Sequence, residues 1–491
     1  MFRSIARSLF CVLISSSLMT FAASRAWASG CPGTPGQSTG PDVIVGVLSH
    51  DIITNYNSLG GIEAFSVGTT SCNLGNTPLI WQSGGINHPV IGQNLFRLKL
   101  VDGTRRFEQL GQSWLKHGFY ALSDYACCST CFGTDGSTLG VGCSDPYSSS
   151  RNGGQSALGP KWAVNATTGV HTHSVTVPGF SGSVARRLQV KIEDLEPSTG
   201  GGGINATRYF VEAQYVAADD AAAGNKNNNA SYRPVSVTGG GASWDFARTG
   251  ATQREKAAIF AWRDVDPAVF ISEVTTAEAN GWTALVLLGS QATDLGGGMW
   301  HYEFALQNLN SDRSIRSFSL PIRPGATVTN LGFRDVDYHS GDGPSGVNCD
   351  GTDWPPVHSY NEVNWETVTF NQNIGGNAIR WGTMYNFRFD SDVPPWPGKG
   401  EITMGYFKPA ANQPDTVLGL GFSPMPCWRG DMNGDGSVDS LDVALFVERL
   451  VNAGASFRER CAGDLALPTD GQILLDDLPE FVDCLLNGGC G

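Results

Sequence analysis

The stretch Gly430–Asp442, GDMNGDGSVDSLD, gathers acidic side chains near the end of a chain that is otherwise low in charge. If Asp431 is position 1 of a loop, oxygen-bearing side chains recur at positions 3, 5, 9 and 12, and glycine stands at position 6. This is the spacing of an EF-hand calcium loop, in which a sharp bend lets about six to eight oxygens surround one ion. The residue at position 7 contributes its backbone carbonyl. The pattern therefore predicts a calcium site formed by Asp431, Asn433, Asp435, Ser437, Asp439 and Asp442.

An apolar pattern typical of a helix follows this loop directly, and the whole unit is repeated further along the chain. DGSVDSLDVALFVERL is echoed by DGQILLDDLPEFVDCL, so Asp442 corresponds to Asp477 and Phe446 to Phe481. The second loop departs from the spacing, because extra residues are inserted and apolar residues stand where oxygens are needed. It is either a weaker calcium site or a structural repeat that completes a helix pair. Its candidate ligands are Asp464, Asp470 and Asp477.

A calcium loop with Asp at position 12, followed by one helix and then duplicated, resembles the type I dockerin family. The resemblance covers residues 427–491 and none of the chain before Pro426. It implies a small α-helical calcium module that attaches enzymes, mostly polysaccharide-degrading ones, to cohesin modules. The residues that it implies for cohesin recognition are Ser440, Leu441, Leu475 and Asp476. Four cysteines depart from the usual dockerin pattern and predict two disulfides, which also fits a self-contained attachment module.

The first 29 residues have the order of a secretory signal peptide. Arg3 and Arg7 precede an apolar run from Leu9 to Ala23, and small residues at Ala26 and Ala28 follow. Removal of this segment takes away three arginines and no acid, so the formal net charge falls from −14 to −17. We expect a secreted or cell-surface protein with no transmembrane segment after signal removal. Its acidity disfavours nucleic acid as a partner.

The rest of the chain has the composition of turn-rich β structure, with 62 glycines among 491 residues and only 16% charged residues. Short apolar runs alternate with glycine-rich turns, as in NLFRLKLVDGTRRFEQLG, whose Asp-Gly predicts a hairpin. One helix is expected at Thr252–Trp262. We predict a mainly β fold of two β-sandwich-like units before the α-helical tail. The expected boundaries are 30–280 for a β-rich domain with a disulfide cluster, 281–410 for a β-sandwich domain, 411–426 for a linker and 427–491 for the tail.

Eleven cysteines remain after the signal peptide. In an oxidising compartment most of them should form disulfides, and the odd number leaves one free or paired between chains. The cluster ACCSTCFGTDGSTLGVGC, within residues 126–143, reads as an irregular loop stapled by such bonds.

The candidates for chemistry before the tail are few, since no nucleophile elbow, zinc-protease helix or phosphate loop is present. Glycoside hydrolysis needs two carboxyl groups across a cleft. Glu212 and Glu303 lie on predicted strands and are the candidate pair, although strand carboxylates are more often solvated. Trp354 and Trp396, in proline-rich loops, are candidates for stacking on sugar rings or for packing on their neighbouring prolines.

A second kind of site is suggested by His171-Thr-His173, because residues two apart on a strand face the same way. Both imidazoles could then hold one copper or zinc ion, with His88 and His117 as further ligands if folding brings them near. The alternative is a pair of loop histidines without a metal.

These observations favour an exported protein with a calcium-binding, dockerin-like tail that binds or degrades extracellular polysaccharide. A glycoside hydrolase is one form of this hypothesis. The first alternative is a non-catalytic surface or matrix scaffold attached through its tail, and the second is a histidine-ligated metalloprotein.

Overall fold

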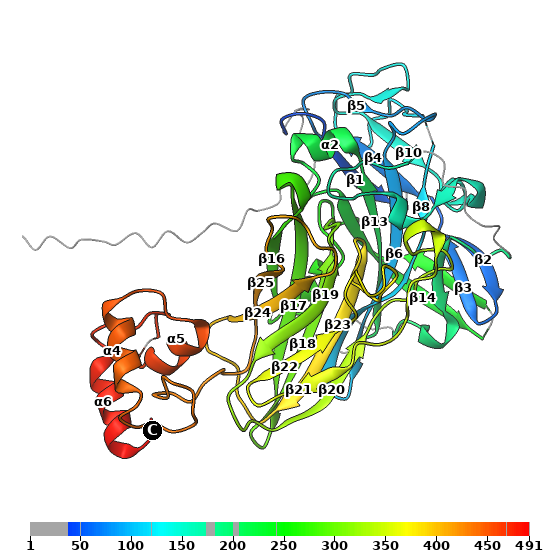
Figure 1. Cartoon of the computed structure of the whole chain (residues 1–491). Helices are drawn as coiled ribbons and strands as arrows, with labels where there is room; N and C mark the ends of the chain where they lie inside the picture. The colour runs from blue at the N-terminus through cyan, green and yellow to red at the C-terminus, as the bar shows by residue number, and fades with distance from the viewer. Residues whose placement is uncertain are drawn as a thin grey trace, which may run out of the picture.

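The computed structural model describes residues 38–49, 51–118, 120–172, 182–199, 206–241, 243–467 and 469–490. The expected signal peptide, residues 1–29, lies outside this part. The prediction of a mainly β fold is confirmed: Figure 1 shows a long body of strands with a small group of helices at one end. Within the described ranges, no helix has the length and apolar character needed to cross a membrane.

The first half of the body is built on one large antiparallel sheet with the strand order β15-β14-β13-β6-β7-β12-β3-β2. A smaller sheet, ordered β1-β4-β10, covers part of it, and the buried core between the two includes Val43, Val45, Leu95, Val211 and Tyr215. The strands of the large sheet are β2 (Thr54–Leu59), β3 (Ile62–Ser66), β6 (Val90–Val101), β7 (Thr104–Gln112), β12 (Leu188–Lys191), β13 (Arg208–Val216), β14 (Ala230–Gly240) and β15 (Ser243–Arg248). Those of the smaller sheet are β1 (Val43–Leu48), β4 (Thr69–Asn73) and β10 (Ser144–Tyr147).

The β6–β7 hairpin confirms the Asp-Gly signal. Val101 pairs with Thr104, so Asp102 and Gly103 are the two turn residues, and both have positive φ angles of 50° and 83°. A two-residue turn of this kind needs left-handed backbone at both positions, which aspartate tolerates and glycine adopts freely.

The second half of the body consists of two five-stranded antiparallel sheets that enclose one core. The strand orders are β16-β17-β18-β23-β20 and β21-β22-β19-β24-β25. The first sheet contains β16 (Phe270–Ala277), β17 (Thr283–Gly296), β18 (Met299–Asn308), β20 (Val328–Arg334) and β23 (Thr383–Ser391). The second contains β19 (Ile315–Pro321), β21 (Pro356–His358), β22 (Glu362–Glu366), β24 (Gly400–Tyr406) and β25 (Thr416–Gly421).

Two of these strands fall outside the expected boundaries. β16 precedes residue 281, and β25 lies within residues 411–426, the expected linker. β25 pairs with β24 in an antiparallel register, with Gly421 opposite Gly400 and Leu418 opposite Thr403.

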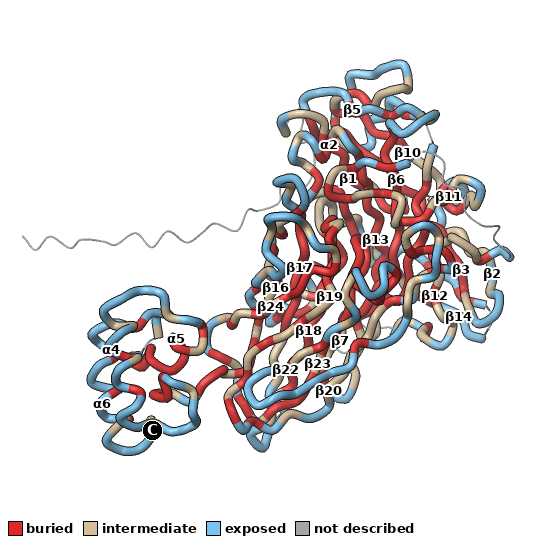
Figure 2. The backbone as a smooth tube through the Cα atoms, viewed as in Figure 1, coloured by how far each residue is buried: buried red, intermediate tan, exposed pale blue. Residues whose placement is uncertain are grey.

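The two halves share buried contacts. The side chains of β18 alternate between two faces, with Tyr302, Phe304 and Leu306 in the core between the two sheets. Its other face is also buried, because it packs on the first half, where Ala305 joins Phe96 and Phe107 in a common cluster. Figure 2 shows the buried backbone running continuously through this region.

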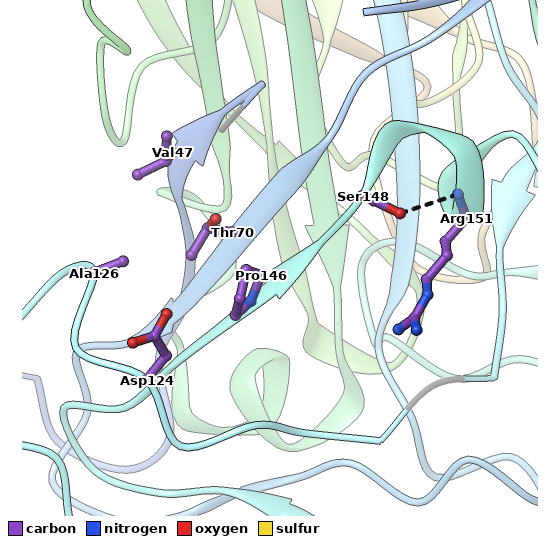
Figure 3. A pocket seen from close by; sticks show the side chains of 7 residues that line it. All are labelled: Val47, Thr70, Asp124, Ala126, Pro146, Ser148 and Arg151. Atoms are coloured by element: carbon purple, nitrogen blue, oxygen red, sulfur yellow. Dashed lines mark hydrogen bonds between the residues drawn. The ribbon is translucent and has the colours of Figure 1, made fainter. Parts of the chain in front are cut away.

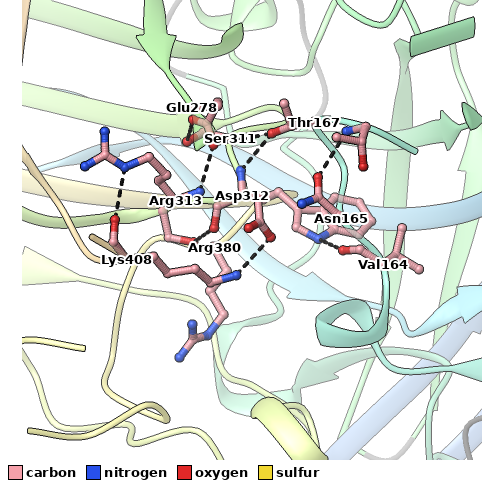
Figure 4. Close-up of polar contacts among 12 residues, drawn as sticks. Val164, Asn165, Thr167, Glu278, Ser311, Asp312, Arg313, Arg380 and Lys408 are labelled. Atoms are coloured by element: carbon pink, nitrogen blue, oxygen red, sulfur yellow. Dashed lines mark hydrogen bonds and ion pairs between the residues drawn. The ribbon is translucent and has the colours of Figure 1, made fainter. Parts of the chain in front are cut away.

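Polar contacts also join the two halves (Figure 4). Thr167 donates its hydroxyl to the carbonyl of Asn310 over 2.8 Å and accepts the backbone N–H of Asp312 over 3.1 Å. Asp312 in turn pairs with Lys408 at 2.9 Å. The loop that carries Thr167 is therefore fixed by the second half.

The helix expected at Thr252–Trp262 is wrong in its bounds, since the structure places α3 at Phe260–Val265. Backbone N–H groups before this helix are bound by side chains from the sheets: Ala258 donates to Glu212 and Ile259 to Gln307. Such contacts compete with helical hydrogen bonds, so the helix begins later in the sequence than expected.

Short elements complete the body. The strands are β5 (Leu79–Ile80), β8 (Leu115–Lys116), β9 (Thr138–Leu139) and β11 (Leu158–Gly159), and the helices are α1 (Ser149–Asn152), α2 (Ala218–Ala223) and the 3₁₀ turns Gln155–Ala157, Lys161–Ala163, Ile192–Asp194, Ala279–Gly281 and Pro344–Gly346.

Disulfides form as the cysteine content predicts. The bonds between described residues are Cys72–Cys127, Cys131–Cys143, Cys427–Cys461 and Cys484–Cys490. Among the described cysteines, Cys349 is the free thiol, which accounts for a cysteine left over.

The tail contains α4 (Val443–Val451), α5 (Phe457–Gly463) and α6 (Leu478–Asn487). Phe446 and Phe481, which occupy equivalent positions in the repeat, stack with their ring centroids 3.9 Å apart. The tail also touches the body, where Phe457 packs edge-on against Trp396 and Arg460 pairs with Glu401 at 2.8 Å. The helices are therefore held at the end of the body rather than on a free linker.

Candidate functional site

The first acidic loop folds around two buried carboxylates, those of Asp431 and Asp442. The Asp431 carboxylate accepts the backbone N–H groups of Gly434 and Gly436 over 2.6 and 3.0 Å. The Asp442 carboxylate accepts those of Asn433 and Asp439, both over 2.9 Å. The first and last acids of the loop thus hold its backbone from both ends.

The intermediate ligand candidates lie on the exposed side of the loop. Asn433 accepts the N–H of Asp435 over 2.8 Å, and Asp435 accepts that of Ser437 over 2.9 Å. Gly436 has a φ of 92°, which provides the bend that the spacing requires. Asp439 accepts the N–H of Leu441 over 2.8 Å. The six residues predicted as calcium ligands of the first loop therefore all belong to one compact turn between Asp431 and Asp442.

Like charges meet inside this turn. Burial raises the pKa of Asp431, and the neighbouring charge of Asp442 raises that pKa further. Two carboxylates held close in a partly desolvated site repel each other, and a bound cation would relieve that repulsion.

The second loop is held in the same way as the first, by a buried aspartate at each end that accepts backbone N–H groups. Asp464 and Asp477 are buried at its two ends. Asp477 accepts the N–H groups of Leu465 and Leu474 over 2.6 and 2.7 Å, and Asp464 accepts that of Gly471 over 2.7 Å. Burial raises the pKa of Asp464, and the charge of Asp477 adds to the shift. Asp470 lies on the exposed side and accepts the N–H of Gln472.

The candidate carboxylate Glu212 lies fully buried on β13. It accepts hydrogen bonds from the side chains of Asn94 and Gln307, at 2.8 and 2.9 Å, and from the backbone of Ala258. Burial raises its pKa. These contacts tie the two halves of the body together.

The other candidate, Glu303, is buried on β18 and bonded to Arg106 and His301 at 3.3 and 3.2 Å. His301 also contacts Asp390 at 2.6 Å. Both carboxylates therefore take part in polar networks within the packed sheets. The two tryptophans considered for sugar stacking, Trp354 and Trp396, are buried as well.

Three histidines from distant parts of the sequence come together in the first half of the body. One ligand atom from each of His88, His117 and His171 lies within 4.8 Å of the others. His173, the second member of the expected pair, lies outside the described residues. Sequence reasoning singled out each histidine, but only the fold shows which of them are neighbours.

Two neighbouring cavities lie beside the disulfide-stapled loop, with volumes of about 530 and 440 Å³. Both are lined by Pro146 and Arg151, and Figure 3 shows the larger one with Asp124 on the facing segment. The smaller one adds Tyr120 and Asp145.

Charged groups of the smaller cavity have altered acidity. Burial raises the pKa of Asp145 to about 7, although its carboxylate accepts the N–H of Leu122 over 3.0 Å. Burial likewise lowers the pKa of Lys116. Sequence reasoning missed these residues, and the cysteine cluster was the only signal that this region is unusual.

Comparison with known proteins adds no assignment, because no protein-family model matches the chain and no curated protein matches its sequence.

Proposed function

We propose that this chain is an exported protein whose body, made of two sandwich-like β units, is attached to a partner protein by a calcium-dependent, dockerin-like tail. The observation that carries this proposal is that the loop-and-helix arrangement of the tail occurs twice. In both repeats two buried aspartates close the loop, and a phenylalanine from the following helix packs on its counterpart. Calcium suits the first loop because its ligand candidates are all oxygens at alternate positions of a tight turn.

The outer face of the tail has the character of a docking surface. Val451 on α4 and Leu486 on α6 occupy equivalent positions of the two repeats and are 74% and 80% exposed. Val447 and Val482, one turn earlier in each helix, are also exposed. Figure 2 shows α4 and α6 on the outer side of the tail, away from the body. Exposed apolar side chains of this kind are typical of protein interaction sites, and the resemblance names a cohesin-like partner.

The attachment is tested by measuring binding of the full mature chain to a panel of cohesin modules in millimolar calcium. We expect saturable binding that chelation abolishes. The double variant Val451→Asp/Leu486→Asp should weaken it at least about tenfold, because two apolar contacts are replaced by buried charges. Val357→Asp is the control, at an apolar residue on β21 that is 51% exposed and lies outside the tail. Binding that survives the double variant would contradict the proposed surface.

A second candidate function, binding of polysaccharide by the body, is favoured by the smaller cavity. Tyr120, 71% exposed, stands beside the polar groups Lys116, Asp145 and Arg151. An aromatic surface next to a few convergent polar groups is typical of a ligand site. The dockerin resemblance independently associates the chain with polysaccharide.

A screen against plant and algal polysaccharides separates the alternatives if it records both retention and release of reducing ends. Retention that falls in Tyr120→Ala, but not in the matched exposed variant Tyr360→Ala, would support binding at this cavity. Release of reducing ends would identify an enzyme of the glycoside hydrolase kind. Neither retention nor release would favour the non-catalytic scaffold.

A further inference from the structure

We propose that His88, His117 and His171 together hold one transition-metal ion of the zinc or copper class. This site is separate from the calcium loops and goes beyond the attachment proposed for the tail. It lies between the end of β8, the segment before β6 and the loop that leads to residue 172.

The spacing of the ring nitrogens suits a common ion. Nε2 of His88 lies 3.2 Å from Nδ1 of His117. Zinc binds imidazole nitrogen at about 2.0–2.1 Å, so two ligands at a tetrahedral angle are about 3.3 Å apart. The rings are inclined rather than stacked, with interplanar angles of 83° for His88 and His117 and 79° for His117 and His171. One ring nitrogen of each histidine lies within 4.8 Å of the others.

The outer contacts of the rings orient them for ligation. Nδ1 of His88 lies 3.2 Å from the carbonyl of Gln82. A carbonyl only accepts hydrogen bonds, so this nitrogen carries the proton and Nε2 presents its lone pair toward His117. Metal-bound histidines characteristically donate their other N–H to a carbonyl or carboxylate in this way.

His171 is also oriented by backbone carbonyls. Its two ring nitrogens lie 3.1 Å from the carbonyl of His88 and 3.3 Å from that of Thr172. A neutral imidazole has a single N–H and can donate to only one of these oxygens. The other nitrogen then carries a lone pair, which is the form of imidazole that binds a metal ion, and one ligand atom of His171 lies within 4.8 Å of those of His88 and His117.

The backbone holds each histidine before any ion arrives. β6 and β8 pair through Ile91 and Lys116, which places His88 and His117 side by side, and the N–H of His117 donates to Ala157 over 2.9 Å. His171 forms a β-bridge with Val164, whose carbonyl accepts the indole N–H of Trp381 over 3.1 Å.

The loop between Val164 and His171, the two residues of this bridge, is the one fixed by the second half of the body (Figure 4). Asn165 pairs with Val170 across it, and Thr167 bonds to Asn310. A site built on such fixed elements loses little conformational freedom when it binds its ion.

The ligand chemistry selects the class of metal. The site offers three imidazoles, and His88 and His171 are almost completely buried. Imidazole suits zinc, copper, nickel and iron, whereas calcium and magnesium prefer oxygen. With three histidine ligands, zinc or copper keeps a further coordination position for water or another ligand.

The test uses the full mature chain, purified without chelators in millimolar calcium so that the tail sites are supplied. Metal content is measured by mass spectrometry, and metal-stripped protein is then titrated separately with Zn²⁺ and Cu²⁺. We expect about one zinc or copper ion per chain. His88→Ala and His171→Ala should each weaken the affinity at least about 100-fold. His358→Ala, an exposed histidine on β21 outside the cluster, should leave it unchanged.

Two further measurements keep the result clear if an alanine variant is unstable. Cobalt substituted into the wild type should show the visible absorption of a tetrahedral nitrogen site, and His117→Gln, at the least buried of the three, should lose it. Asp431→Ala should retain the transition metal, because that residue belongs to the calcium loop. The proposal is overturned if no saturable zinc or copper binding occurs, or if binding persists in the histidine variants and disappears in Asp431→Ala.

Discussion

Gly159→Ala should weaken metal binding at the histidine cluster without removing a ligand. Gly159 lies on β11 opposite β8, and a Cβ built on it would be 2.8 Å from Nε2 of His117. Ordinary contact begins at 3.4 Å, so the ring must move by about 0.6 Å. Metal–ligand distances tolerate only about 0.2 Å, and disturbed outer contacts typically cost 10–100-fold in affinity. That range corresponds to about 1.4–2.8 kcal/mol of binding free energy.

The assay is competition between the protein and a chromophoric zinc chelator. Gly84→Ala is the matched control, since it lies in the loop before His88 and a Cβ there meets nothing within 4 Å. A double-mutant cycle isolates the clash: Gly159→Ala should have no effect on zinc affinity when His117 is already alanine. An affinity of Gly159→Ala within about twofold of the wild type, in a folded protein, would show that His117 is not a ligand.

Three further predictions concern stability. Phe481→Ala should reduce the unfolding free energy of the tail by about 3–5 kcal/mol, because it leaves a cavity against Phe446, and hydrogen exchange in the intact chain measures this locally. Replacing both Cys427 and Cys461 by alanine opens a link across 34 residues and should cost the tail about 3–4 kcal/mol, measured in the same way. Asp145→Asn should stabilise the body increasingly as pH rises from about 4 to 7. In this range the unfolded chain releases the Asp145 proton while the folded wild type retains it up to a pKa of about 7, so wild-type stability falls with a slope of up to about 1.4 kcal/mol per pH unit. Denaturant melts at pH 5 and 8 should therefore show a larger gain from the substitution at pH 8.

Local signals in the sequence were sufficient where the structure is decided by neighbouring residues. The Asp102-Gly103 turn, the alternation of β18 and the start of α4 after Asp442 all follow from short patterns. The compact turn from Asp431 to Asp442 belongs to the same class, because its spacing alone determines which side chains share the loop.

Features that depend on distant segments could not be predicted in this way. The three histidines lie on separate segments, and nothing in the sequence indicates that β6 pairs with β8 beside the loop of His171. The burial of Glu212 and Glu303 is a second case, because their strands pack against the other half of the body. Strand periodicity shows which face of a sheet a residue lies on, but it does not show what covers that face.

The most direct test of the account is a calorimetric calcium titration of the full mature chain, with hydrogen exchange recorded across residues 427–490. The account predicts saturable binding of at least one calcium ion, slower exchange in the loop from Asp431 to Asp442, and loss of both effects in Asp435→Ala. Wild-type protein that shows neither binding heat nor slower exchange at millimolar calcium would contradict the central claim.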